Sequence, residues 1–267
     1  MTDTASHPSA AGSDAAVTES AVYSVLSNVV ERYSGSDLVA MKAVKSLRIN
    51  GTAVGLELQF GFPLGDYAAE IEAQVKAAVE SLHGVDNALV FISTEIRSHA
   101  VQSGLKPLKK IKNIIAVASG KGGVGKSTTA VNLALALAAD GAKVAVLDAD
   151  IYGPSQPRML GIEGRASSKD QNSIEPLERH GVQAMSIGFL IDENEPMVWR
   201  GPMVTQALGQ LLNDTNWADL DYMIIDMPPG TGDTQLSLSQ RIPVSGAVII
   251  TTPQDIALLD ARKGLKM

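Results

Sequence analysis

A glycine-rich run with two lysines carries the clearest chemistry in the sequence: Gly-Lys-Gly-Gly-Val-Gly-Lys-Ser at residues 120–127. It matches the pattern G-x-x-x-x-G-K-[ST] and stands between a strand-like apolar segment (114–119) and a helical segment that begins at Lys126. Glycines let successive backbone N–H groups turn inward around phosphate oxygens, and the helix N-terminus adds partial positive charge. Lys126 would neutralise the β- and γ-phosphates, and the Ser127 hydroxyl would ligate Mg²⁺. The run therefore predicts a nucleotide site rather than a plain glycine turn.

Lys121 is a second cation inside the same loop. By itself it is an exposed side chain at a loop tip, but beside phosphates it could stabilise developing charge as an arginine finger does. We expect Lys121 and Lys126 to act in catalysis. The residues predicted to bind ATP are Gly120, Lys121, Gly122, Gly123, Val124, Gly125, Lys126, Ser127, Thr128 and, from a later segment, Gly230.

Two aspartates follow the predicted strand at 143–148. Asp148 ends the strand and Asp150 comes two residues later, so in extended chain both carboxylates face the same side. There they can hold Mg²⁺ through water or orient an attacking water molecule. The alternative is a strand that ends in a turn-forming aspartate, which is common.

A third carboxylate ends the apolar run Tyr-Met-Ile-Ile-Asp at 222–226, the pattern of a Walker B strand. Asp226 is expected to bind Mg²⁺, together with Ser127 and Asp148. The segment 227–233 follows, and its glycine at position 230 would let a backbone N–H approach the γ-phosphate. An apolar strand that ends in aspartate is weak evidence for a nucleotide site by itself, and it becomes specific evidence because the glycine-rich loop precedes it in the sequence.

The remaining sequence indicates two domains of different kinds. A polar tail (1–18) is predicted to be disordered, and a small α+β domain (20–98) and a linker (99–112) precede an α/β domain (113–267). In the small domain, periodicity predicts a helix from Ser20 to Tyr33, a strand over 54–60, a helix capped by Asp66 and a strand over 87–94. In the larger domain, apolar strands over 114–119, 143–148, 182–187, 222–226 and 247–251 alternate with helices over 126–140, 203–213 and 255–266, which predicts a parallel sheet covered on both faces.

Composition excludes several classes of protein. The 267 residues contain 22 Lys and Arg against 29 Asp and Glu, a net charge of −7, which argues against a general nucleic-acid binder. No apolar run is long enough to span a membrane, and residues 1–21 carry no Lys or Arg, which argues against a signal or mitochondrial leader. We expect a cytoplasmic protein without nucleic-acid or membrane partners. The sequence has no cysteine, and so no disulfide or thiolate metal site.

Several separated motifs resemble one known family. The run GKGGVGKST resembles the deviant phosphate-binding loop of the MinD, ParA and Mrp ATPase superfamily. The segments DADIYGPS (148–155), MVWRGPM (197–203), DMPPGTGD (226–233) and TTPQDIALLDARKG (251–264) resemble the Mrp/ApbC iron–sulfur cluster carrier family. The front domain, with VVERYSGSDLVAMKAVKSLRING, resembles the small cluster-assembly-factor domain that many bacterial members carry.

The resemblance implies a slow, Mg²⁺-dependent ATPase that forms a homodimer and delivers iron–sulfur clusters to apo acceptor proteins, with assembly factors as further partners. In that family, Lys121 would reach the partner's nucleotide, Asp150 would position water and Asp148 would lie near the metal.

Two departures accompany the resemblance. The family holds its cluster with a Cys-x-x-Cys pair beyond the last predicted helix, and this sequence has no cysteine and stops at Met267. We therefore expect a chain truncated before its cluster ligands, because clusters need thiolates. The front domain also lacks a cysteine near Phe62, where its relatives often carry one.

Two other interpretations stay open. A MinD- or ParA-type positioning or partitioning ATPase shares the loop and the carboxylates. The front domain, the acidic balance and the absence of a basic amphipathic terminal helix argue against it. The second is a fragment without activity.

Overall fold

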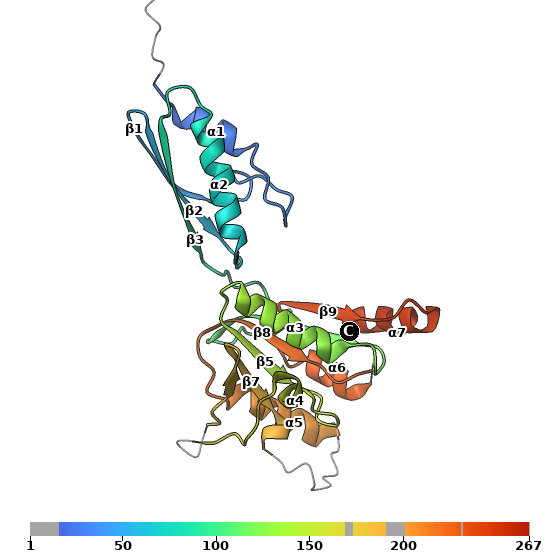
Figure 1. The fold of residues 1–267 in the computed structure, drawn as a ribbon. Helices are drawn as coiled ribbons and strands as arrows, with labels where there is room; N and C mark the ends of the chain where they lie inside the picture. The colour runs from blue at the N-terminus through green and yellow to red at the C-terminus, as the bar shows by residue number, and fades with distance from the viewer. Residues whose placement is uncertain (1–15, 169–172, 191–200, 231, 267) are drawn as a thin grey trace, which may run out of the picture. The chain divides into compact units, whose positions relative to one another are not determined.

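The computed structural model describes residues 16–168, 173–190, 201–230 and 232–266 (Figure 1). The chain divides into two compact units, Met1–Glu95 and Ile96–Met267. Residues 1–15 of the predicted tail and residues 197–200 of the motif at 197–203 lie outside the described residues. No helix in the described part of the chain is long and apolar enough to cross a membrane.

The first unit is a three-stranded sheet with two helices. Its sheet has the order β1-β2-β3, with β1 antiparallel and β3 parallel to the central strand. The alternating residues Val54, Leu56, Leu58 and Phe60 are buried and share one apolar core with Ile71 and Val75 of the second helix, which explains why this helix and strand were readable from periodicity. The elements are α1 (Glu19–Leu26), β1 (Val44–Asn50), β2 (Ala53–Phe60), α2 (Tyr67–Glu80) and β3 (Asn87–Thr94).

The first helix ends at Leu26, so the prediction of a helix to Tyr33 was wrong. Beyond the helix, Glu31 is fully buried and accepts hydrogen bonds from the backbone N–H groups of Tyr33 (2.8 Å) and Ser34 (2.7 Å). These bonds satisfy the two donors in a turn instead of a helix. Val30 and Tyr33, whose spacing continued the apolar stripe, are 54% and 64% exposed.

Two further details of this unit differ from the sequence prediction. Strand β1 was missed because its pairing with β2 shifts between Val44 and Ser46, a bulge that breaks the alternation of apolar and polar residues. Asp66 stands at the N-cap position of α2 as predicted, but its side chain makes no capping hydrogen bond.

The second unit is an α/β fold with a six-stranded sheet, which confirms the predicted fold class. Its strand order is β6-β7-β5-β8-β4-β9, parallel throughout except for the antiparallel pair β6–β7 at one edge. The elements are β4 (Ile111–Ser119), α3 (Lys126–Ala139), β5 (Val144–Asp148), α4 (Gln156–Leu160), β6 (Leu177–Arg179), β7 (Val182–Ser186), the 3₁₀ turn η1 (Ile187–Phe189), α5 (Gly201–Asn213), β8 (Leu220–Asp226), α6 (Asp233–Ser239), β9 (Gly246–Ile250) and α7 (Asp255–Leu265).

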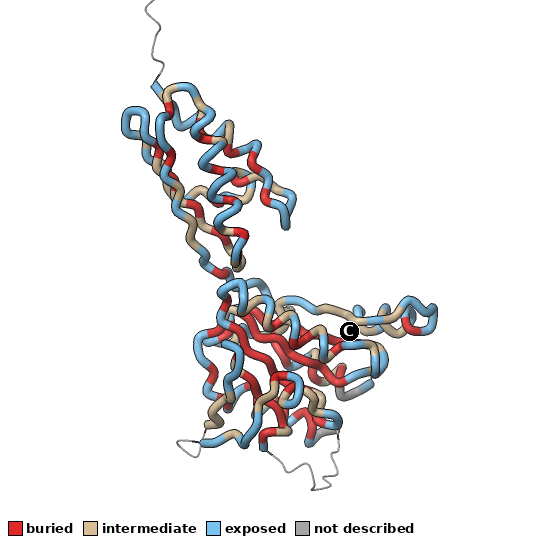
Figure 2. Tube along the Cα trace, in the orientation of Figure 1, coloured by how far each residue is buried: buried red, intermediate tan, exposed pale blue. Residues whose placement is uncertain are grey.

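Apolar cores cover both faces of this sheet. On one face, Ala130 and Ala134 of α3 pack against Val144, Val146 and Ile224. The other face packs against residues of α4, α5 and α6, including Leu160, Leu208, Leu211 and Leu238. Figure 2 shows the buried residues concentrated along the central strands. Burial on both faces explains the uninterrupted apolar runs that the sequence shows in place of alternation.

Every strand predicted in this unit is present within three residues of its predicted ends, and the three predicted helices are present as well. The short elements α4, β6 and α6 were missed, because three to seven residues show too little periodicity. Strand β4 begins at Ile111, two residues inside the segment predicted as linker.

Candidate nucleotide-binding site

The carboxyl ends of β4, β5 and β8 meet at one edge of the sheet. In the strand register, Asp148 lies opposite Asp226, and Val117 of β4 lies on the other side of Asp226. The glycine-rich loop leaves β4 directly at this edge, so residues 100 positions apart come together. Such edges are where open α/β sheets bind ligands.

The loop between β4 and α3 has the backbone that its glycines require. Gly123 has φ +76° and Gly125 has φ +89°, in the left-handed region that favours glycine. Gly125 is the N-cap of α3, and its carbonyl oxygen accepts a bond from the Thr129 N–H (2.9 Å). Among the described residues, no atom outside the chain neighbours lies within 4 Å of a Cβ built on Gly122, Gly123 or Gly125. Conformation, and not crowding, therefore requires glycine at positions 123 and 125.

The first glycine of the loop is required for a different reason. A Cβ on Gly120 would lie 2.6 Å from Cβ of Asp260 and 3.2 Å from the backbone nitrogen of Ala261, both in α7. Only hydrogen at this position lets the helix approach the loop. The position of α7 and the position of the phosphate loop are therefore linked.

The centre of the site is a buried ion pair. Lys126 is 6% exposed and Asp226 fully buried, and Lys126 Nζ pairs with Asp226 Oδ1. The same ammonium lies 3.2 Å from Ser127 Oγ. Gln156, which sequence reasoning missed, donates its side-chain amide to Asp226 Oδ2 (2.8 Å) and to the Ser127 carbonyl oxygen (3.2 Å). Both carboxylate oxygens of Asp226 are thus engaged, one by a cation and one by a neutral donor.

Asp148 organises the chain that follows β5. Its Oδ1 accepts a bond from the Asp150 N–H (3.2 Å), and its Oδ2 accepts bonds from the N–H groups of Ser155 (2.9 Å) and Gln156 (3.1 Å). The hydroxyl of Ser186, a second residue that sequence reasoning missed, donates to the same Oδ2 (3.2 Å). Burial raises the pKa of Asp148 to about 7, although the backbone donors oppose the shift. Asp148 therefore holds the loop 149–155 in place at the site.

Asp150 is half-buried beside the same centre. Burial raises its pKa above the ordinary value, and the positive charge of nearby Lys126 opposes that rise. The charge of Lys126 thus acts on a second carboxylate besides Asp226. A carboxylate that is partly exposed and close to the loop is suited to hydrogen-bond a water molecule.

The other predicted residues take several positions. Lys121 and Thr128 are exposed, and Val124 is half-buried. Lys121 makes no ion pair with any residue that the structure describes. The Gly230 N–H, expected to approach a phosphate, donates instead to the Ser119 carbonyl oxygen (2.9 Å), with Gly230 at φ +102°.

The donor set suits a small hard cation. The hydroxyl of Ser127 and the carboxylate of Asp226 lie against the same ammonium, and oxygen ligands of this kind are those that Mg²⁺ prefers. The described residues do not offer a cation site made of protein ligands alone, because they contain no group of three or more His, Cys, Asp or Glu that could hold a metal ion. Nor does the sequence contain a cysteine for an iron–sulfur cluster.

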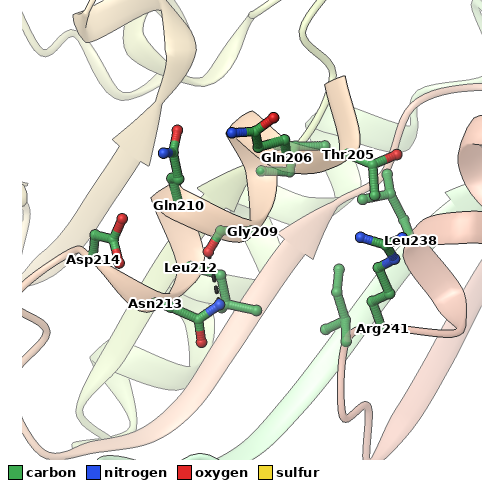
Figure 3. A pocket seen from close by; sticks show the side chains of 11 residues that line it. Thr205, Gln206, Gly209, Gln210, Leu212, Asn213, Asp214, Leu238 and Arg241 are labelled. Carbon is green, nitrogen blue, oxygen red and sulfur yellow. Dashed lines mark hydrogen bonds between the residues drawn. The ribbon is translucent and has the colours of Figure 1, made fainter. Parts of the chain in front are cut away.

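A separate hollow of about 390 Å³ lies between α5 and α6 (Figure 3). Its lining includes the apolar residues Leu208, Leu212 and Leu238 and the charged residues Asp214 and Arg241. It shares no residue with the site at the sheet edge.

Comparison with known proteins assigns the chain to a family. Residues 110–267 match the family described as NUBPL iron-transfer P-loop NTPase, which is more than half of the chain. The chain belongs to this iron-transfer P-loop NTPase family. Residues 19–90 match a second family, described as iron–sulfur cluster assembly protein.

Individual relatives of this NTPase agree with the assignment. The chain is 61% identical over 195 residues to an iron–sulfur cluster carrier protein from Pseudomonas fragi, and the match covers 72% of this chain and 68% of that protein. A protein of the same description from Synechocystis is 46% identical over 256 residues, covering 94% and 72%. The chain spans 63% to 72% of the length of the first curated relatives that it matches.

A solved structure gives the same fold. A nucleotide-binding protein from Archaeoglobus fulgidus in complex with ADP superposes with a TM-score of 0.52 at 41% identity, covering 60% of this chain and 62% of that one.

Proposed function

We propose that this chain binds and hydrolyses ATP with Mg²⁺, and that the whole protein is a cytoplasmic carrier that binds iron–sulfur clusters and transfers them to apo acceptor proteins. The observation that carries the proposal is the buried pair of Lys126 and Asp226 at the end of the glycine loop. A buried lysine at a helix N-terminus, beside the backbone N–H groups of a glycine-rich loop, is suited to an anion. The cluster-carrier names of the relatives and the ADP in the Archaeoglobus fulgidus structure support it.

The ion pair suggests how nucleotide enters. Lys126 would leave Asp226 for the β- and γ-phosphates, and the amides of residues 122–127 would cradle the phosphate oxygens. Asp226 and the Ser127 hydroxyl would hold Mg²⁺, which supplies charge neutralisation at the phosphates when bound. The exchange replaces one buried charge pair by two, so neither charge is left unpaired.

Three further residues would complete the site. Asp150 would orient the water that attacks the γ-phosphorus in line with the leaving oxygen, while Asp148 keeps the loop 149–155 in place. Lys121, exposed at the loop tip, would cross to the nucleotide of a second copy in a homodimer. In that position its charge would stabilise the transition state.

Cluster carriage is proposed for the whole protein on the strength of its relatives. These 267 residues contain no cysteine, so they offer no thiolate ligands for a cluster.

The test separates binding from chemistry. Asp150→Ala is expected to bind ATP as the wild type does and to hydrolyse it at least about 100-fold more slowly, because general-base groups contribute roughly 10²–10⁴-fold. The measurement is phosphate release alongside calorimetric ATP binding. Wild-type turnover in this variant would remove Asp150 from the mechanism. For the cargo, the assay is cluster reconstitution on the whole protein followed by transfer to an apo acceptor, and failure of reconstitution would refute the carrier role.

A further inference from the structure

The side chain of Gln156 joins three segments of the site. It stands at the first residue of α4 and is only 1% exposed. Its Nε2 donates to Asp226 at the end of β8 and to the carbonyl oxygen of Ser127 at the start of α3. These partners are 70 and 29 residues away in the sequence. One amide thus ties α4 to both the carboxylate and the phosphate loop.

We propose that Gln156 is a positioning residue for the divalent cation: its amide holds the Asp226 carboxylate in the orientation that binds the metal after Lys126 has moved to the phosphates. The inference rests on the proposed nucleotide site and adds a residue to it.

The charges at Asp226 give the first argument. In the structure, Lys126 engages Oδ1 and Gln156 engages Oδ2. When Lys126 turns to the phosphates, Oδ1 is released and Oδ2 stays bound, so the carboxylate keeps its orientation while one oxygen becomes available. A neutral amide can remain beside an arriving cation, whereas a second lysine would repel it.

The backbone of Gln156 supplies the second argument. Its N–H and that of Ser155 both donate to Oδ2 of Asp148, which is itself fully buried. The Cα of Gln156 is therefore fixed by the same carboxylate that fixes the loop carrying Asp150. A side chain mounted on such an anchor can orient Asp226, because its own position is determined independently.

The third observation concerns the oxygen of the Gln156 amide. Gln156 Oε1 is buried and accepts no hydrogen bond from any residue in the described part of the chain. It belongs to the same amide as Nε2, so it lies beside Asp226 and Ser127. A buried amide oxygen without a donor is costly. This oxygen is therefore suited to accept a hydrogen bond from a donor that enters the site with the nucleotide and its cation.

The test replaces the amide side chain of Gln156 by methionine, an apolar side chain of similar volume. In Gln156→Met we expect ADP affinity without divalent cation to stay within twofold of the wild type. In the presence of ADP, the Mn²⁺ concentration for half-saturation, measured by electron paramagnetic resonance of free Mn²⁺, is expected to rise at least tenfold. The matched control is Gln183→Met, a half-buried glutamine in β7 whose Oε1 accepts a bond from the Ala218 N–H, and it is expected to bind Mn²⁺ as the wild type does.

Each result decides something. Unchanged Mn²⁺ binding in a folded Gln156→Met would overturn the positioning role, and so would an equal loss of ADP affinity with and without metal. If Gln156→Met does not fold by circular dichroism, Gln156→Asn decides, because its amide is one methylene too short for Asp226 and the same selective rise is expected. A wild-type chain that binds no ADP at all would instead refute the proposed nucleotide function.

Discussion

Removal of the negative partner from the buried pair is the perturbation with the clearest expected magnitude. Asp226→Asn leaves the Lys126 ammonium, whose side chain is 7% exposed, without its counter-ion. Breaking a buried pair from one side costs about 3–5 kcal/mol. We expect the lower end, about 3 kcal/mol, because the ammonium keeps its contact with Ser127 Oγ at 3.2 Å.

The assay is urea unfolding of the nucleotide-free chain, monitored by tryptophan fluorescence. Both tryptophans, Trp199 and Trp217, belong to the second unit, so the signal reports the unit that contains the pair. Trp217 is 3% exposed and donates to the Leu212 carbonyl oxygen, so its environment changes on unfolding.

The matched control uses an aspartate at the other end of the same strand. Asp221 pairs with Lys112 at 2.8 Å, and its own side chain is 14% exposed, but the lysine side chain is 44% exposed. An asparagine oxygen can still accept the bond that Asp221 Oδ2 accepts from the Lys143 N–H (2.9 Å), so Asp221→Asn is expected to cost no more than about 1 kcal/mol. The double variant Lys126→Met/Asp226→Asn is expected to recover most of the loss, because no buried charge is then left unpaired. A free energy of unfolding for Asp226→Asn within about 1 kcal/mol of the wild type would refute the buried pair.

Three further variants test separate parts of the account. Gly120→Ala places a methyl group against the backbone of α7 at Asp260 and is expected to destabilise the second unit by about 1–3 kcal/mol in the same assay. Gly122→Ala is not, because its Cβ would meet no atom of the described residues within 4 Å beyond its chain neighbours. Lys121→Ala is expected to leave stability within about 0.5 kcal/mol of the wild type, because the side chain is exposed, and to abolish ATP-dependent dimers in analytical ultracentrifugation; persisting dimers would exclude its crossing to a partner. Glu31→Ala removes two hydrogen bonds from a buried carboxylate and is expected to destabilise the first unit by roughly 2 kcal/mol, read out as faster amide exchange over residues 31–36; unchanged exchange would contradict the role given to this turn.

The strand–loop–helix at 111–139 could be predicted because its signals are local. The glycine spacing, the apolar run before it and the periodic helix after it all lie within 30 residues. The parallel sheet followed from apolar runs, and a parallel sheet brings the ends of β5 and β8 to one edge. The meeting of Asp148 and Asp226 was therefore within reach of the sequence.

What these carboxylates contact could not be predicted. The partners of Asp148 include Ser186, 38 residues away, and Asp226 pairs with a lysine 100 residues away. Gln156 carried no signal, because a single glutamine before a proline has many uses and its partners are set only by the folded sheet. The turn after the first helix was missed for a similar reason. A count of apolar periodicity cannot distinguish Glu31, a buried glutamate that bonds the backbone, from a glutamate on the surface of a helix.

The central claim is that Lys126 exchanges Asp226 for a phosphate. Isothermal titration of the folded 267-residue chain with ADP and Mg²⁺ tests it most directly. We predict saturable heat at one nucleotide per chain in the wild type, and loss of that heat in Lys126→Met. No heat from the folded wild type, or the same affinity in Lys126→Met, would contradict it.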